Sequence, residues 1–229
     1  MKRIYLIGLL TLIPRLCEAI DESKCYGTSD NGYLENGWQL PSSGKNFSAY
    51  SFVGVAAGRN YVHSKVHRTV LDAYQTLETK TPSKVFVYGE SGFENGGKFR
   101  PHKTHQNGLS IDFFVPVINE SGKSVELPAN LFNKFGYGIE FVGKGEYNGL
   151  SIDYNTMAQH LRALYVAANN NGVKIWRVIF DNKLQKELFK TSIGSEIKRE
   201  LAFSTKKPWV RHDRNVSMTL GHQAVLFSV

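Results

Sequence analysis

The sequence has little cysteine and no long hydrophobic run. Two cysteines in 229 residues exclude a disulfide-rich scaffold and a zinc module built from four cysteines. No stretch reaches the roughly 18–20 apolar residues of a membrane span, so we predict no integral membrane span in the mature chain. Hydrophobic residues still make up 41% of the chain, which excludes global disorder. The length suits one medium-sized domain.

The first nineteen residues have the pattern of a secretory signal peptide. Lys2 and Arg3 form a positive start, residues 4–14 are almost wholly apolar, and residues 17–19 offer small side chains to a signal peptidase. We therefore predict a signal peptide over residues 1–19 and a single mature domain over residues 20–229. The alternative for this segment is a buried first strand or helix.

The mature chain is moderately basic and has one thiol. Residues 1–19 hold three of the 28 Lys and Arg and one of the 20 Asp and Glu, so the mature chain keeps a net charge of +6. Such a charge suits anionic partners such as a cell wall or a membrane surface. No compact Lys and Arg cluster points to nucleic acid, which we exclude as a partner. Cys25 alone cannot form an internal disulfide.

Hydrophobic periodicity predicts both helices and strands. Residues 20–50 are an extended segment with short strands at best, and residues 118–150 are a loop or a small subdomain. The pattern indicates helices at 62–77, 157–168 and 182–201, and strands at 85–88, 109–117, 173–180 and from Trp209 onward. Because strict βαβ alternation is missing, we predict a single α+β domain with a mainly antiparallel sheet flanked by helices.

A carboxylate interrupts the apolar strand at 109–117. Alternation places Asp112 on the face opposite Ile111, and a lone carboxylate there is costly unless a metal ion or a basic side chain pairs with it. Gly108 allows a tight turn that brings His105 back beside Asp112, and these two side chains are suitable zinc ligands. His102 can orient a metal ligand through a hydrogen bond, or it can bind substrate. The alternative is an aspartate that holds a loop through hydrogen bonds, with surface histidines nearby.

These residues form a recognisable motif. His102, His105, Gln106, Gly108 and Asp112 fit the pattern H-x-x-H-Q-x-G-x-x-x-D. That pattern resembles the first metal motif of the penicillin-insensitive murein endopeptidases, which belong to the LAS-type zinc metallopeptidases.

Two further segments extend the resemblance. Residues 58–63 are similar to the family segment G-R-N-Y-x-H, and residues 209–213 follow in the same order as in the family. The resemblance covers roughly residues 50–215 and implies a LAS metallopeptidase-like fold.

The resemblance implies a periplasmic zinc endopeptidase that cuts the peptide cross-links of peptidoglycan. Its partners would be the peptide stems of peptidoglycan, and its cofactor Zn²⁺ would have three protein ligands and a water. By this resemblance His105 and Asp112 are zinc ligands, and His212 has a catalytic or transition-state role. Arg59 and Asn60, like His102, are candidates to bind substrate or to orient the metal ligands through hydrogen bonds. A turn that caps the following helix is the alternative for Arg59 and Asn60.

The C-terminal metal motif is degenerate. After His212 and Asp213 the family has two further histidines, but this chain has Asn215 and Ser217. Serine is a poor zinc ligand, so the third ligand is missing from its expected place.

Three explanations are open. The protein is a catalytically inactive peptidoglycan-binding or regulatory homologue, or another histidine (His63, His102 or His222) completes the site. The third is a frameshifted gene tail: one choice of codons for residues 214–218, read two bases on, encodes Glu-Arg-Phe-His.

Several other side chains have structural interpretations. His63 and His67 are four residues apart, and we expect an exposed helix start there rather than a metal site. We expect His160 on an apolar helix face and Asp153 as a helix N-cap. Four aromatic residues are predicted in the core: Phe113, Phe114, Trp176 and Phe180.

Overall fold

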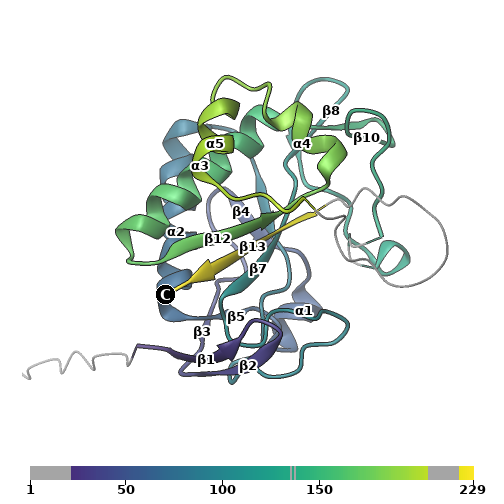
Figure 1. The fold of residues 1–229 in the computed structure, drawn as a ribbon. Coiled ribbons are helices and arrows are strands. Elements are labelled where there is room, and N and C mark those ends of the chain that lie inside the picture. Colours follow the sequence, from purple (N-terminus) through teal and green to yellow (C-terminus); the bar gives the residue numbers. More distant parts are fainter. Residues whose placement is uncertain (1–21, 135, 137, 206–221) are drawn as a thin grey trace, which may run out of the picture.

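The computed structural model describes residues 22–134, 136, 138–205 and 222–229 (Figure 1). The expected signal peptide at 1–19 lies outside the described residues. So do His212, Asn215 and Ser217 of the terminal motif.

A mainly antiparallel sheet of five strands forms the centre of the molecule (Figure 1). In spatial order the strands are β12 (Lys174–Ile179), β13 (His222–Ser228), β7 (Ser110–Phe114), β6 (Phe86–Tyr88) and β4 (Phe47–Ala49). Only β4 and β6 pair in parallel. The predicted α+β class with a mainly antiparallel sheet is therefore confirmed.

Helices cover one face of this sheet. Two long helices, α2 (Ser64–Lys80) and α3 (Tyr154–Asn170), pack on each other and on the sheet, followed by the shorter α4 (Asn182–Leu188) and α5 (Gly194–Glu200). The helices predicted at 62–77 and 157–168 correspond to α2 and α3. The helical region predicted at 182–201 is split into α4 and α5 by a turn at residues 189–193. No helix among the described residues is long and apolar enough to cross a membrane.

Strand β7 is buried on both faces. Ile111 and Phe113 face the helices and join the hydrophobic core, while Ser110, Asp112 and Phe114 point to the other side. Its neighbours β13 and β6 shield both edges. A strand enclosed in this way can hold a carboxylate only where other groups compensate it.

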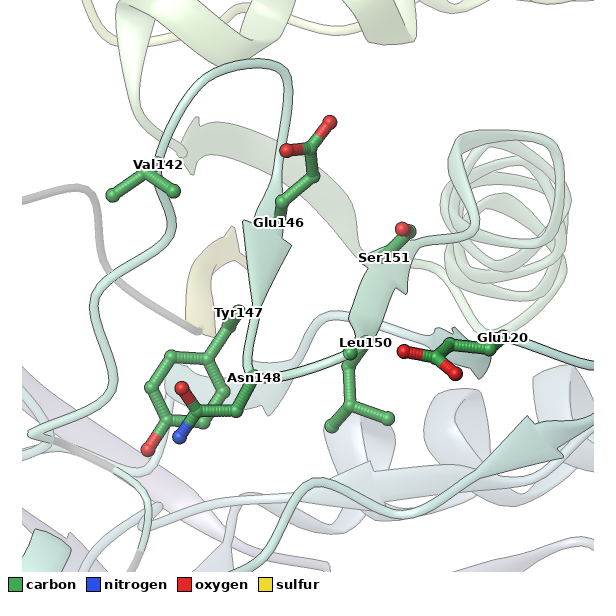
Figure 2. A pocket seen from close by; sticks show the side chains of 8 residues that line it. Glu120, Val142, Glu146, Tyr147, Asn148, Leu150 and Ser151 are labelled. Atoms are coloured by element: carbon green, nitrogen blue, oxygen red, sulfur yellow. The ribbon is translucent and has the colours of Figure 1, made fainter.

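The segment predicted as a loop or small subdomain folds as a second sheet. Its four strands are β10 (Glu146–Tyr147), β11 (Leu150–Ile152), β8 (Val117–Asn119) and β9 (Ser124–Val125), and a short 3₁₀ helix spans Leu131–Asn133. An open hollow of about 420 Å³ lies beside β10 and β11, with the carboxylates of Glu120 and Glu146 among its lining groups (Figure 2).

The N-terminal part supports the loop that precedes β7. It contains β1 (Lys24–Thr28), β2 (Asn31–Glu35), β3 (Trp38–Gln39), β5 (Tyr61–Val62) and the short helix α1 (Phe52–Ala56). The β1–β2 hairpin is tied to the 93–107 loop by backbone bonds from Leu34 N to Asn95 O (3.1 Å) and from Gln106 N to Ser29 O (3.0 Å). The hairpin thus braces the loop that carries the histidines.

Two predicted environments are wrong. Trp176 is 53% exposed rather than buried, because it lies on the edge strand β12 at an irregularity in the pairing between Ile175 and Arg177. His63 starts α2 as predicted but is buried, and its imidazole accepts a bond from Lys65 N. Asp153 is confirmed as an N-cap, accepting from Thr156 N at 3.0 Å.

Candidate functional site

Three side chains from one stretch of eleven residues meet beside β7. His102, His105 and Asp112 each offer one ligand atom, and these atoms lie within 4.8 Å of one another. Asp112 comes from the middle of β7, and both histidines come from the loop before it. Gly108, with a φ of +74°, makes the turn that folds His105 back onto the strand. The structure therefore brings together the two expected zinc ligands and His102.

The imidazole of His105 is held in one orientation. Its Nδ1 lies 3.1 Å from the carbonyl oxygen of Ser110. Because a carbonyl only accepts, Nδ1 carries the proton, and the neutral ring then has its lone pair on Nε2. Nε2 is buried, has no hydrogen-bond partner among the residues that the structure describes, and lies 3.5 Å from Oδ1 of Asp112. A buried nitrogen without a partner is costly, and a metal ion shared with Asp112 would satisfy it.

His102 bridges two carboxylates. Its Nε2 lies 2.5 Å from Oε2 of Glu90, and its Nδ1 lies 3.6 Å from Oδ2 of Asp112. The side chain is 19% exposed, so it is the most accessible of the three donors. Two imidazoles and one carboxylate form a donor set that suits zinc.

Glu90 is a site residue that the sequence reasoning missed. It lies two residues beyond the end of β6, and its carbonyl oxygen accepts from Asp112 N at 3.0 Å, so its backbone lies beside Asp112. Its Oε1 accepts from Tyr50 Oη at 2.9 Å and forms an ion pair with Nε of Arg59. The sequence did contain a signal for Glu90. Like Asp112, it is a carboxylate next to a strongly apolar strand, and such a group needs a compensating partner.

Glu90, His102 and Arg59 shift one another's pKa values. Burial opposes the charged form of Glu90, but hydrogen bonds from His102 and Arg59 outweigh it and hold the pKa of Glu90 at about 2. Burial likewise disfavours charged His102, yet the bond to Glu90 and the charge of Asp112 raise the pKa of His102. In the same way, the pKa of Arg59 is raised by Glu90 against the effect of burial. The result is a buried ionic network beside the cluster.

Arg59 and Asn60, the two candidates from the family segment at residues 58–63, have different surroundings. The guanidinium of Arg59 lies 4.1 Å from the centre of the Phe99 ring and donates to Arg100 O at 2.9 Å. Asn60 is fully buried, and its amide donates to Leu40 O at 2.7 Å. Arg59 thus lies next to the cluster, whereas Asn60 ties the chain to the interior. A contact of either residue with substrate stays a prediction.

The structure describes two of the alternative third ligands, His63 and His102, in full and the third, His222, by its backbone alone. His63 caps α2 and is not among the clustered residues. The backbone of His222 pairs with Phe114 in β13. His102 is the histidine among the described residues that joins His105 and Asp112.

Two comparisons bear on these observations. The sequence model of the penicillin-insensitive murein endopeptidases matches residues 25–222. That range contains the clustered residues and the strands that position them. A comparison with curated proteins found no match.

Proposed function

The chain belongs to the penicillin-insensitive murein endopeptidase family, and on this basis we propose that it is an exported zinc endopeptidase that cuts peptide cross-links of peptidoglycan. The family makes peptidoglycan the expected substrate. The observation that carries the zinc part is the buried Nε2 of His105, which has no partner in the described part of the chain and lies beside Asp112 and His102. A periplasmic location and export through residues 1–19 belong to the same proposal.

The donor set fits a zinc ion. His105 would bind through Nε2, since its Nδ1 is used by Ser110 O, and Asp112 would bind through its carboxylate. His102 would supply the third ligand through Nδ1, which is the nitrogen facing Asp112. With this assignment the site does not need a histidine at position 217, because all three ligands come from residues 102–112. When bound, zinc would polarise the scissile carbonyl and lower the pKa of a water. That water would then lose a proton near neutral pH and could attack the carbonyl.

The residues around the ion prepare the site before substrate arrives. Ser110 O fixes the tautomer of His105, and Glu90 accepts the Nε2 proton of His102. The guanidinium of Arg59 keeps Glu90 ionised. His212 would act on the reacting groups as a general base or by stabilising the oxyanion.

A second candidate is a catalytically inactive homologue that binds peptidoglycan. Asn215 and Ser217 favour it, because they replace two histidines of the terminal motif. A frameshifted gene tail remains the third explanation, and sequencing the locus tests it: an out-of-frame histidine codon near position 217 supports it.

The test combines metal content with hydrolysis. The purified chain is dialysed against metal-free buffer, and its zinc is measured alongside His105→Ala and His67→Ala. His67 lies on α2 outside the cluster and is the matched control. We expect about one zinc per chain in the wild type and the control, and loss of zinc in His105→Ala. Purified peptidoglycan should release cross-link fragments, and a chelator should stop this release.

The outcomes separate the candidates. Zinc binding with chelator-sensitive cleavage supports the endopeptidase. Zinc binding without cleavage supports the inactive homologue. Absence of zinc from the wild-type chain contradicts the metal site.

A further inference from the structure

We propose that Glu90 is a positioning residue that presents His102 to the metal site. This inference rests on the proposed function, because it assigns His102 as a zinc ligand. It adds a device that the family motif does not contain: a carboxylate from the segment after β6 that sets the orientation of one ligand.

The contact between the two side chains defines the orientation. Nε2 of His102 lies 2.5 Å from Oε2 of Glu90, while Nδ1 is the nitrogen nearer to Asp112, at 3.6 Å from Oδ2. Since an ionised carboxylate only accepts, Nε2 must carry the proton. Neutral His102 then has its lone pair on Nδ1, on the side of His105 and Asp112.

Glu90 is itself held from three directions. Its backbone carbonyl is bonded to Asp112 N at 3.0 Å, and Gly89 N returns a bond to Asp112 O at 2.7 Å. Tyr50 and Arg59 fix its other carboxylate oxygen. The carboxylate is 9% exposed, so it has little freedom to move. The position of Oε2 is therefore set by the sheet, and His102, on a loop, follows it.

The two histidines differ in what orients them. His105 is oriented by the neutral carbonyl of Ser110, whereas His102 is oriented by a charged carboxylate. A carboxylate partner raises the basicity of a metal-bound imidazole more strongly than a neutral acceptor does. The more exposed of the two loop histidines thus has the charged partner.

A purely structural role for Glu90 makes a different prediction. If Glu90 served only to neutralise Arg59, its replacement would lower stability without acting through His102. If it positions His102, its effect on zinc affinity must disappear once His102 is removed. A double-mutant cycle distinguishes these cases.

The experiment measures zinc dissociation constants by competition with a chromophoric chelator. The variants are Glu90→Gln, His102→Ala and the double substitution, and Glu94→Gln is the matched control because Glu94 is an exposed glutamate four residues away. We expect Glu90→Gln to weaken zinc binding by about 10–100-fold, and Glu94→Gln to leave it unchanged. In the His102→Ala background, Glu90→Gln should have no further effect. An equal loss in both backgrounds, or no loss in either, overturns the proposal.

A second measurement does not need the metal. In the metal-free wild type at alkaline pH, nitrogen NMR should find the proton of neutral His102 on Nε2, and in Glu90→Ala this preference should be lost. A proton on Nδ1 in the wild type overturns the proposal. A wild-type chain that binds no zinc yet shows the Nε2 proton contradicts the proposed function while leaving the orientation by Glu90 established.

Discussion

His160 offers a test of the core that is independent of the metal site. It lies on α3, is almost fully buried, and is surrounded by the rings of Tyr74, Phe86 and Phe113 at centroid distances of 5.6, 5.0 and 4.8 Å. Within the described ranges of the chain, neither ring nitrogen has a hydrogen-bond partner. We expect His160→Leu, which keeps a similar volume, to stabilise the protein.

The magnitude follows from burial and protonation. An unsatisfied buried polar group costs about 1–3 kcal/mol, so at pH 7 we expect a gain of about 2 kcal/mol in the free energy of unfolding. Burial also lowers the pKa of His160 from 6.5 to about 3. Below pH 6.5 His160 becomes protonated in the unfolded chain but stays neutral in the folded chain. The free energy of unfolding therefore falls as the pH falls. Between pH 7 and pH 5 this single group removes about 2 kcal/mol.

The assay is urea unfolding of the metal-free chain at pH 7 and pH 5. The other titrating groups are shared, so the difference between wild type and His160→Leu isolates this imidazole. We expect the stabilising effect of the substitution to grow from about 2 kcal/mol at pH 7 to about 4 kcal/mol at pH 5. Gln159→Leu, in the same turn of α3, is the control and should show no such growth. Equal acid sensitivity of wild type and His160→Leu would refute the reasoning.

Two further predictions concern the supports of the fold. Asp153→Ala removes the N-cap of α3 and the 2.6 Å ion pair with Lys84. It should cost about 1–2 kcal/mol in urea unfolding, whereas Asp153→Asn, which keeps a capping oxygen, should cost less; an equal cost would contradict the capping role. Gly108→Ala combines a φ of +74° with a Cβ only 2.7 Å from His63 N, so it should cost about 3 kcal/mol and weaken zinc binding. Gly97→Ala, with a similar φ and open space around its Cβ, should cost about 1 kcal/mol; a larger loss there than at Gly108 would count against the steric argument.

Local patterns in the sequence predicted those features of the fold and of the site that depend on a single helix, strand or turn. The apolar periodicity at Val66, Val70 and Leu77 predicts α2, because a helix buries one face whatever it packs against. Alternation around Asp112 separates its two faces for the same reason. The pairing of His105 with Asp112 was also accessible, since one glycine turn connects them.

The features that the sequence analysis missed or predicted wrongly depend on which segments become neighbours in the fold. Glu90 reaches His102 only because β6 lies beside β7, and no local pattern specifies that pairing. The pattern around Trp176 is typical of a buried strand, but β12 forms the edge of the sheet. The burial of His63 depends on contacts of α2 with the N-terminal segment, where Ser64 N donates to Ser23 Oγ at 2.8 Å.

The short span of the three donors also affects the unfolded chain. His102, His105 and Asp112 lie within eleven consecutive residues, and closing so short a loop costs little entropy. Under the proposed zinc site, we therefore expect the unfolded polypeptide to keep an appreciable affinity for the same ion. A metal that binds both states stabilises the folded one only by the difference between the two affinities. Zinc should raise the melting temperature by less than its affinity for the folded protein alone implies.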